Sequence, residues 1–209
     1  MKIPFRYQAT NYDCVPTTFI NALQYLFERE DLPPEVIHKV MQYSLDSINK
    51  RGELGRGTTG LACQLILQWV ESYKPKDFKK FSIDYRYLQG GDVHLKQNNS
   101  IVSCLNRGGV ALLRLCNNRV GSEFHYALAL SADAECLYFF DPYYRVKNFS
   151  GDDAKAMEWL GDLEREGFSK GQSPNLRIRR ERLDAEKYEK YSMGPIDERE
   201  CCLIERTYT

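Results

Sequence analysis

The sequence lacks an excess of either charge, and it lacks any apolar run long enough to cross a membrane. Lys plus Arg and Asp plus Glu number 29 each, so the chain has no net basic charge that would attract nucleic acids or anionic membranes. Its best apolar run, residues 110–113, ends at Arg114, whereas a membrane span needs roughly 20 residues. We therefore expect no nucleic-acid partner and no membrane span.

We also expect no secretory signal, because the chain turns polar soon after residues 1–5. The seven cysteines are an odd number, and without a signal we expect them to be mostly free thiols in a reducing compartment. These features predict a cytoplasmic protein. The hydrophobic fraction of 43%, with 14 Tyr and 10 Phe, is sufficient for a sizeable core.

Charge is unevenly distributed along the chain. Residues 150–209 carry 25 of the 58 charged residues (29 of each sign), and the other 33 are spread over the first 149 positions. The total length suits one domain, and neither a linker nor an internal repeat separates the two parts. We therefore expect a compact body, residues 1–149, with a charged helix-and-strand extension, residues 150–209, packed on the same domain.

Helical periodicity is concentrated in the first third of the chain. A first helix is expected to begin at Cys14 or Val15, capped by Asn11 or Asp13. Two more helices are expected, one on either side of the glycine-rich loop 52–60. The expected apolar positions of the three helices are, in order, Phe19, Ile20, Leu23 and Leu26; Val36, Ile37, Val40, Met41 and Leu45; and Leu61, Leu65, Trp69 and Val70.

Strand patterns follow the helices. Strands are expected at residues 81–87, 109–116, 124–130 and 136–140, with a short helix at 101–105, a longer helix at 152–166 and late strands at 176–183 and 201–207. The strands 124–130 and 136–140 are expected to pair antiparallel through a turn near Asp133. Helices first and an antiparallel sheet afterwards indicate the α+β class.

His125 is the histidine whose surroundings favour a chemical role. His38 is expected to be a solvated helical residue and His94 a residue of a polar loop, whereas His125 opens an apolar strand between two aromatic residues. Asp141 ends the next strand, so a hairpin would bring the two side chains to the same open end, where the carboxylate can orient the imidazole. Taken singly, a satisfied strand histidine and an Asp-Pro turn are ordinary structural features.

Cys14 is the candidate nucleophile. At a helix N-terminus the dipole and the free N–H groups favour a thiolate over a thiol. The carboxylate of Asp13 opposes this effect, so a histidine partner is needed to form the ion pair. The side-chain amide of Gln8 can join the backbone N–H of Cys14 in an oxyanion hole.

Residues 8–23 resemble the active-site helix of papain-like cysteine peptidases. They are most similar to the bacteriocin-processing peptidases that cut after double-glycine leaders. That family shows a Gln, a catalytic Cys that opens a helix, a His that precedes an apolar strand, and an Asp-Pro at the end of the next strand. The corresponding residues here, in the same order, are Gln8, Cys14, His125 and Asp141.

The resemblance covers about residues 5–145 and includes the loop 57–60, which is similar to the family's second landmark. One position departs from the pattern, because Val15 stands where the family usually has Gly after the Cys. We expect this β-branched side chain to narrow the groove in which a peptide backbone would lie.

The resemblance implies a papain-like α+β fold, with N-terminal helices packed on a C-terminal antiparallel sheet. It implies a thiol hydrolase that cleaves a peptide or related amide or thioester bond through an acyl-enzyme on Cys14, without a cofactor or metal. His125 would transfer protons, Asp141 would position His125, and Gln8 would bind the oxyanion. The alternatives are an acyltransferase with the same triad, a non-cleaving peptide-binding module of this fold, and an interaction role based on the charged tail.

Other motifs have simpler interpretations. Residues 55–60 match the dinucleotide-binding glycine pattern but follow no expected strand, so we prefer a turn with Thr58 or Thr59 as a helix cap. The adjacent Cys201 and Cys202 lack the spacing of a zinc site. The cysteines in apolar segments are expected to be buried core thiols: Cys63, Cys104, Cys116 and Cys136.

Overall fold

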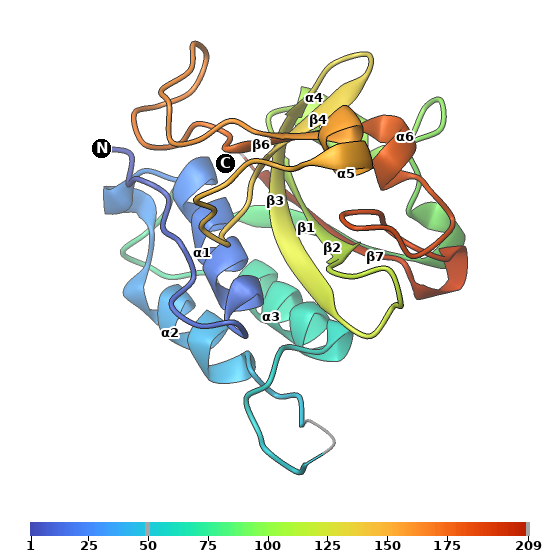
Figure 1. The fold of residues 1–209 in the computed structure, drawn as a ribbon. Coiled ribbons are helices and arrows are strands. Elements are labelled where there is room, and N and C mark those ends of the chain that lie inside the picture. Colours follow the sequence, from blue (N-terminus) through green and yellow to red (C-terminus); the bar gives the residue numbers. More distant parts are fainter. Residues whose placement is uncertain (49–50, 208–209) are drawn as a thin grey trace.

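One antiparallel sheet, buried on both faces, organises the fold. The computed structural model describes residues 1–48 and 51–207, in which seven strands occur in the order β1-β7-β2-β3-β4-β6-β5 (Figure 1). From edge to edge they are β1 (Ile83–Gln89), β7 (Glu200–Arg206), β2 (Val110–Cys116), β3 (Phe124–Ala132), β4 (Cys136–Phe140), β6 (Leu176–Arg179) and β5 (Met157–Trp159). The predicted combination of helices with an antiparallel sheet is confirmed.

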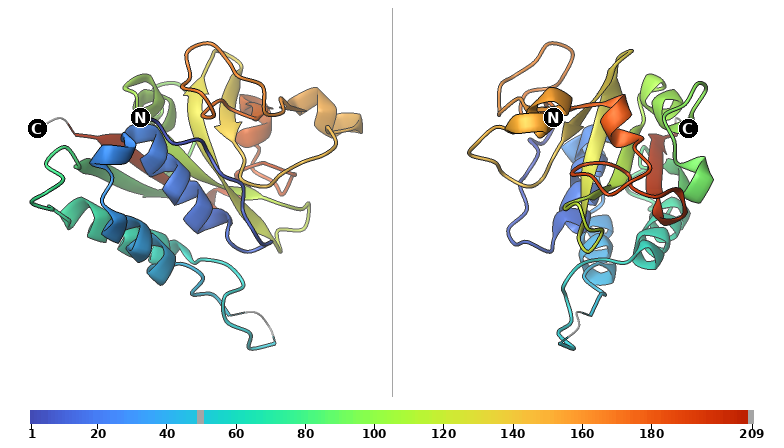
Figure 2. Two further views of the ribbon diagram at one scale, coloured as in Figure 1. Left: turned by 90° about the vertical axis from the view of Figure 1, so that its left-hand side faces the viewer. Right: turned by 45° about the vertical axis from the view of Figure 1, so that its right-hand side comes forward.

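Helices cover the sheet on both sides. One face carries α1 (Cys14–Leu26), α2 (Pro34–Tyr43) and α3 (Gly60–Ser72), which lie together in both views of Figure 2. The other face carries α4 (Ser100–Asn106) and α6 (Arg180–Leu183), while α5 (Gly151–Ala156) leads into β5. Short 3-10 turns occur at Arg29–Asp31, Gly90–Asp92 and Ile196–Glu198. Among the residues that the structure describes, no helix is long and apolar enough to cross a membrane.

Alternation along the central strands explains the three layers. In β2, Val110 and Leu112 face the layer of α1, α2 and α3, whereas Ala111 and Leu113 face the opposite layer. All four residues are buried, so this strand appears in the sequence as a continuous apolar run.

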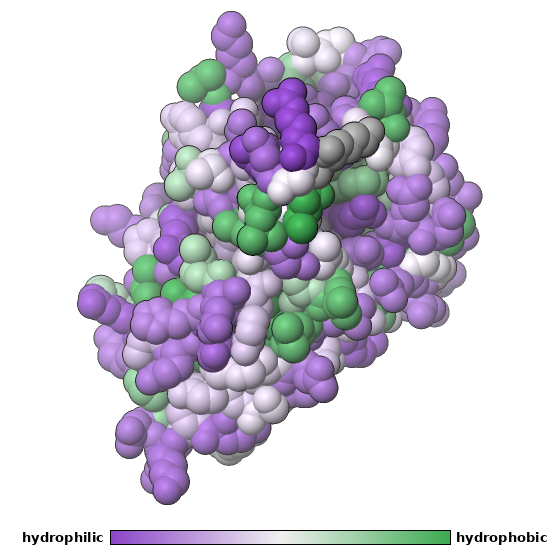
Figure 3. Space-filling view, turned by 90° about the horizontal axis from the view of Figure 1, so that it is seen from below, coloured by the Kyte–Doolittle hydropathy of each residue, from purple (hydrophilic) through white to green (hydrophobic). Residues whose placement is uncertain are grey.

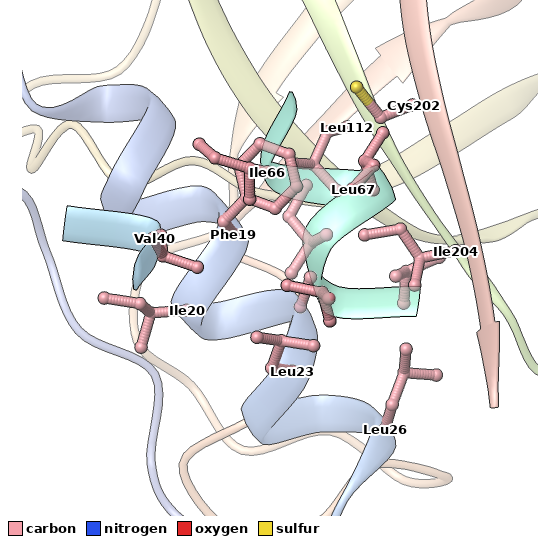
Figure 4. Close-up of a cluster of buried hydrophobic side chains, with 14 of the residues drawn as sticks. Phe19, Ile20, Leu23, Leu26, Val40, Ile66, Leu67, Leu112, Cys202 and Ile204 are labelled. Atoms are coloured by element: carbon pink, nitrogen blue, oxygen red, sulfur yellow. The ribbon is translucent and has the colours of Figure 1, made fainter. Parts of the chain in front are cut away.

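The larger part of the core lies between α1, α3 and the sheet. Phe19 and Leu23 of α1 and Leu67 of α3 belong to one buried cluster, to which the sheet contributes Leu112 and Ile204 (Figure 4). Each such side chain, when fully buried, stabilises the fold by about 1.5–3 kcal/mol. This packing anchors α1, whose first residue is Cys14.

The start of α1 agrees with the sequence prediction, but the predicted apolar face of α3 is partly wrong. Leu61 is 76% exposed and Leu65 is 47% exposed, whereas Ile66 and Leu67 are buried with Val70. The sheet packs against the side of α3 that carries Ile66, Leu67 and Val70, so these residues form its buried face. Leu45 is predicted on the apolar face of the second helix, but α2 ends at Tyr43, so Leu45 lies outside this helix.

The helix predicted at residues 152–166 is wrong in its extent. It stops at Ala156, because Met157 leaves the helical path and pairs with Ile178 as part of edge strand β5. Met157 is buried in the part of the core that α4 and α6 cover. The strand predicted at residues 176–183 likewise ends at Arg179 and continues as α6.

Strand β7 lies in the interior of the sheet, between β1 and β2. Ile204 pairs with Tyr85 of β1, and Cys202 pairs with Leu112 of β2. The charged C-terminal part of the chain therefore contributes β5, β6 and β7 to the same sheet as the preceding residues. Segments on both sides of position 149 build one structure.

Arg199, directly before β7, is a fully buried arginine. Its guanidinium donates to Asp184 Oδ1 at 2.6 Å and to the carbonyl oxygens of Asp184, Val93 and Gly194 at 2.8–2.9 Å. One buried cation thus holds three separate loops. A buried charge is tolerated because its hydrogen-bonding capacity is satisfied.

We predict that Arg199→Met lowers the free energy of unfolding by about 3–5 kcal/mol, because a carboxylate and three carbonyl groups lose their donor. Urea denaturation followed by circular dichroism measures this change. Arg177→Met is the control, since Arg177 pairs with Glu158 at 2.6 Å on the surface, with both side chains nearly half exposed, and such pairs contribute about 1 kcal/mol or less. Equal losses in the two variants would contradict the role of Arg199.

Candidate active site

A buried hydroxyl fixes α1 against β3. Thr18 Oγ1 donates to the carbonyl oxygen of Tyr126 at 3.1 Å. Cys14 lies one turn before Thr18 on the same face of the helix, and His125 precedes Tyr126 on the strand. This contact brings Cys14 beside His125, and the thiol and the imidazole each shift the other's pKa.

The hairpin of β3 and β4 places Asp141 next to His125. Leu128 pairs with Phe140, the last residue of β4, so Asp141 follows at the open end of the hairpin. Asp141 Oδ1 lies 2.6 Å from His125 Nε2. Because Nε2 is engaged by the carboxylate, Nδ1 is the ring nitrogen left for the Cys14 thiol.

Asp141 is completely buried, and several donors surround its carboxylate. The hydroxyl of Tyr191 donates to Oδ2, and the backbone N–H of Tyr143 donates to Oδ1 at 2.9 Å. Arg145 Nη2 donates to the Tyr191 hydroxyl at 2.5 Å, and Arg145 Nε lies 3.9 Å from Oδ2. The carboxylate therefore has donors on both oxygens besides the imidazole, which suits an ionised group in a buried site.

Asn175 holds the backbone of Asp141. Its Oδ1 accepts from the Asp141 N–H at 2.7 Å, and its Nδ2 donates to the Asp141 carbonyl at 2.9 Å. The side-chain amide thus pairs with the backbone of Asp141, the first residue after β4, as a neighbouring strand would. It fixes the direction in which the carboxylate points.

The pKa shifts favour a charged Cys14–His125 pair. Burial alone would lower the pKa of His125, but the charge of Asp141 and the hydrogen bonds to Asp141 and Cys14 raise it to about 10. Burial alone would raise the pKa of Cys14, yet the hydrogen bond and charge of His125, with nearby backbone N–H groups, hold it below its ordinary value. The pKa of Asp141 is lowered despite burial, by His125 and by the Tyr191 hydroxyl.

Gln8 lines the same cleft as Cys14 and His125. Its Nε2 donates to the carbonyl of Thr10 at 2.6 Å, which uses one of its two N–H groups. Its backbone N–H donates to Pro142 O at 2.9 Å, which attaches the segment before α1 to the turn that follows Asp141.

The predicted side-chain cap of α1 is wrong. Asp13 precedes the helix with φ −96° and ψ 24°, outside the extended conformation of most N-caps, and makes no side-chain cap bond. Its carboxylate instead accepts from the N–H groups of Ala9 and Thr10 at 2.9 and 2.7 Å. Asp13 therefore orders the loop that carries Gln8.

The cleft has a volume of ≈ 580 Å³, and its lining includes Gln8, Tyr12, Cys14, His125, Tyr143 and Lys190. The starts of α1 and β3 are the lower ends of these two elements in Figure 1, and Figure 3 shows the molecule from below. The surface there is mostly hydrophilic, with hydrophobic residues in small separate groups (Figure 3).

Val15 does not line the cleft. Its side chain is 1% exposed and belongs to the core cluster beneath α1, so the expectation that it narrows the groove is wrong. The helix rotates this residue away from the side on which Cys14 meets His125. The position after Cys14 therefore contributes to packing.

The remaining sequence motifs have structural roles. Residues 55–60 lead into α3, and the Thr59 hydroxyl caps that helix by accepting from Ala62 N at 3.2 Å, as the preferred interpretation requires. His38 is exposed on α2, and His94 lies in a loop where its Nδ1 accepts from Lys96 N at 3.2 Å. Each of the seven cysteines is a buried free thiol.

Sequence reasoning missed three residues around Asp141: Arg145, Asn175 and Tyr191. They lie in segments without helical or strand periodicity, and Tyr191 and Asn175 are distant from Asp141 in the chain. Tyr191 adopts a left-handed φ of 61°, which no sequence pattern around it predicts. Of the three, only Arg145 is close to Asp141 in the sequence, four positions after it, so its positive charge was the one available signal of a partner for the carboxylate.

No group of three or more His, Cys, Asp or Glu side chains arranged to hold a metal occurs in residues 1–48 and 51–207. The sequence matches no model of a known protein family and no curated protein. The interpretation of the site therefore depends on its own geometry.

We predict that Asp141→Asn lowers the pKa of His125 from about 10 and raises that of Cys14. Without the carboxylate charge, both burial and the nearby Arg145 cation disfavour the imidazolium, and the thiolate loses its counter-charge. The midpoint of the pH profile of Cys14 alkylation should rise by at least about one pH unit. At pH values below the original midpoint, this shift lowers the alkylation rate about tenfold. Thermal unfolding checks that the variant is folded, and an unchanged profile would contradict the coupling.

Proposed function

We propose that this protein is a cysteine hydrolase of papain-like type that cleaves a peptide or related amide bond through an acyl-enzyme on Cys14. The supporting observation is the connected series Cys14–His125–Asp141, in which the thiol and the imidazole line one cleft. These residues come from a helix N-terminus, a strand and the end of the neighbouring strand. The order and the elements are those that the resemblance to papain-like peptidases implies.

In the proposed acylation step, the Cys14 thiolate attacks the carbonyl carbon and forms a C–S bond. The carbonyl electrons move to oxygen, then re-form the double bond as the C–N bond breaks. His125 donates its proton to the leaving amine and becomes neutral. Asp141 keeps the imidazole oriented, and its charge stabilises the imidazolium before this transfer.

In deacylation, neutral His125 accepts a proton from water while the water oxygen attacks the acyl carbon. The C–S bond then breaks, which releases a carboxylic acid and restores the thiolate–imidazolium pair. The oxyanion of both steps would accept from the Cys14 backbone N–H and from the Gln8 amide N–H that Thr10 does not use. Removing one such donor in another hydrolase costs about 3–4 kcal/mol of transition-state stabilisation.

Thiol reactivity tests the ion pair. We predict that iodoacetamide labels Cys14 already at about pH 5–6, because a paired thiolate persists below the ordinary thiol pKa of about 8.5. The other thiols should react slowly, since burial raises the pKa of Cys104, Cys116, Cys136 and Cys201. Peptide mass mapping measures each site. In His125→Ala the Cys14 profile should move toward about pH 8.5, and an unactivated thiol in the unchanged protein would favour a non-cleaving binding module.

Acyl transfer to Cys14 can be measured directly with p-nitrophenyl acetate. Acylation releases p-nitrophenolate in a burst of about one equivalent and leaves an acetyl group that mass spectrometry locates on Cys14. Cys14→Ala should abolish the burst, whereas Cys136→Ala, the matched control on β4, should retain it. A burst that survives in Cys14→Ala would refute the proposed nucleophile.

A further inference from the structure

Lys190 is a half-buried cation in the lining of the cleft that holds Cys14 and His125. Its neighbour Tyr191 is fixed by the hydrogen bond to Asp141. Backbone bonds from Tyr191 N to Cys116 O and from Cys116 N to Ser192 O, both 2.8 Å, attach this segment to the end of β2. The carbonyl of Lys190 also accepts from Arg182 at 3.2 Å. The backbone from which the ammonium extends is therefore held in place.

The ammonium of Lys190 has no carboxylate within ion-pair distance among the described residues 1–48 and 51–207. Its nitrogen, Nζ, lies over the ring of Phe149, 5.8 Å from the ring centroid. Burial and the charges of Arg145 and Arg119 lower its pKa, and the more distant carboxylates of Asp153 and Asp141 only partly oppose this effect. Removing a cation from water without a partner is unfavourable, so an anion that entered the cleft would gain from pairing with it.

Other charges near the cleft are largely engaged. Arg145 is bound to Tyr191 and lies close to Asp141, and Arg56 pairs with Glu53 at 3.0 Å. The lining also includes one carboxylate, the exposed Glu123, whose Oε2 lies 3.4 Å from Asn117 Nδ2. Lys190 is thus the cation of the lining that has no carboxylate within ion-pair distance in the described part of the chain.

We propose that the cleft takes an anionic acyl donor, whose carboxylate or phosphate near the scissile carbonyl pairs with Lys190. This inference rests on the proposed function, because it assigns a substrate class to the same cysteine site. Lys190 acts in specificity, by favouring a substrate of negative charge over a neutral one. A neutral double-glycine peptide would not use this cation.

Two alkylating reagents of similar size, one anionic and one neutral, provide the test. Iodoacetate carries a carboxylate next to the reacting carbon, and iodoacetamide is its neutral counterpart. The measured quantity is the ratio of their second-order rate constants at Cys14, which cancels changes in the intrinsic reactivity of the thiolate. We expect Lys190→Gln to lower this ratio about fivefold, as for one partly screened charge interaction.

Three further variants make the result specific. Lys190→Arg should keep the ratio, and Lys190→Glu should lower it further than Lys190→Gln. Lys187→Gln is the matched control, because Lys187 is exposed, pairs with Glu189 at 2.8 Å and lies outside the cleft lining. An equal ratio in the unchanged protein and Lys190→Gln, with iodoacetamide labelling still fast, would overturn this inference alone. Slow iodoacetamide labelling in the unchanged protein would instead refute the proposed function.

Protection experiments distinguish the two sources of the anion. A glutamyl-glutamate dipeptide and inorganic pyrophosphate are each added at millimolar concentration during iodoacetamide labelling of Cys14. Protection by the dipeptide, lost in Lys190→Gln, assigns a carboxylate of a peptide. Protection by pyrophosphate, lost in the same variant, assigns the phosphate of a thioester carrier. Protection by neither, or protection that Lys190→Gln retains, contradicts the inference.

Discussion

The buried carboxylate of Asp141 is the charge around which the site is built. An isolated ionised carboxylate is strongly disfavoured in a protein interior, so the fold must supply compensation from every side. It does so with His125 at 2.6 Å, with the backbone N–H of Tyr143 at 2.9 Å and with the hydroxyl of Tyr191, which Arg145 in turn contacts. The imidazolium is thus part of the compensation for a buried charge. That same requirement keeps the pKa of His125 high and, through it, the pKa of Cys14 low.

The need to satisfy Asp141 also joins distant parts of the chain. Asn175 bonds to both backbone groups of Asp141, and the next residue, Pro142, accepts from the backbone of Gln8. Gln172, near Asn175, donates to the carbonyls of Ile3 and Gln24, at 2.9 and 2.8 Å. The segment before α1 and the segment before β6 therefore meet at the end of β4. Together with β7 in the middle of the sheet, these contacts explain why the charged C-terminal part belongs to the same structural unit as the site.

Local patterns were sufficient for part of this architecture. The helix start at Cys14 and the hairpin that brings His125 to Asp141 depend on neighbouring residues, so periodicity and turn chemistry predict them. The buried face of α3 was not predictable in this way, because the helix has apolar residues on two sides and only the position of the sheet selects one. Tyr191 was harder still. A tyrosine in a charged, irregular segment gives no periodic signal, and its role depends on a left-handed backbone and on a carboxylate far away in the chain.

Residues 190 and 191 couple recognition to the triad in the proposed function. The two residues are adjacent, and the left-handed turn at Tyr191 directs its hydroxyl to Asp141 while Lys190 lines the cleft. A bound anion paired with Lys190 would therefore contact the same short segment that positions the Tyr191 hydroxyl. That hydroxyl donates to Asp141 Oδ2, and the other oxygen, Oδ1, lies against His125, so this segment also helps to orient the imidazole. A substrate without the anion would lack this contact, so the charge of the acyl donor can influence both its binding and the readiness of the nucleophile.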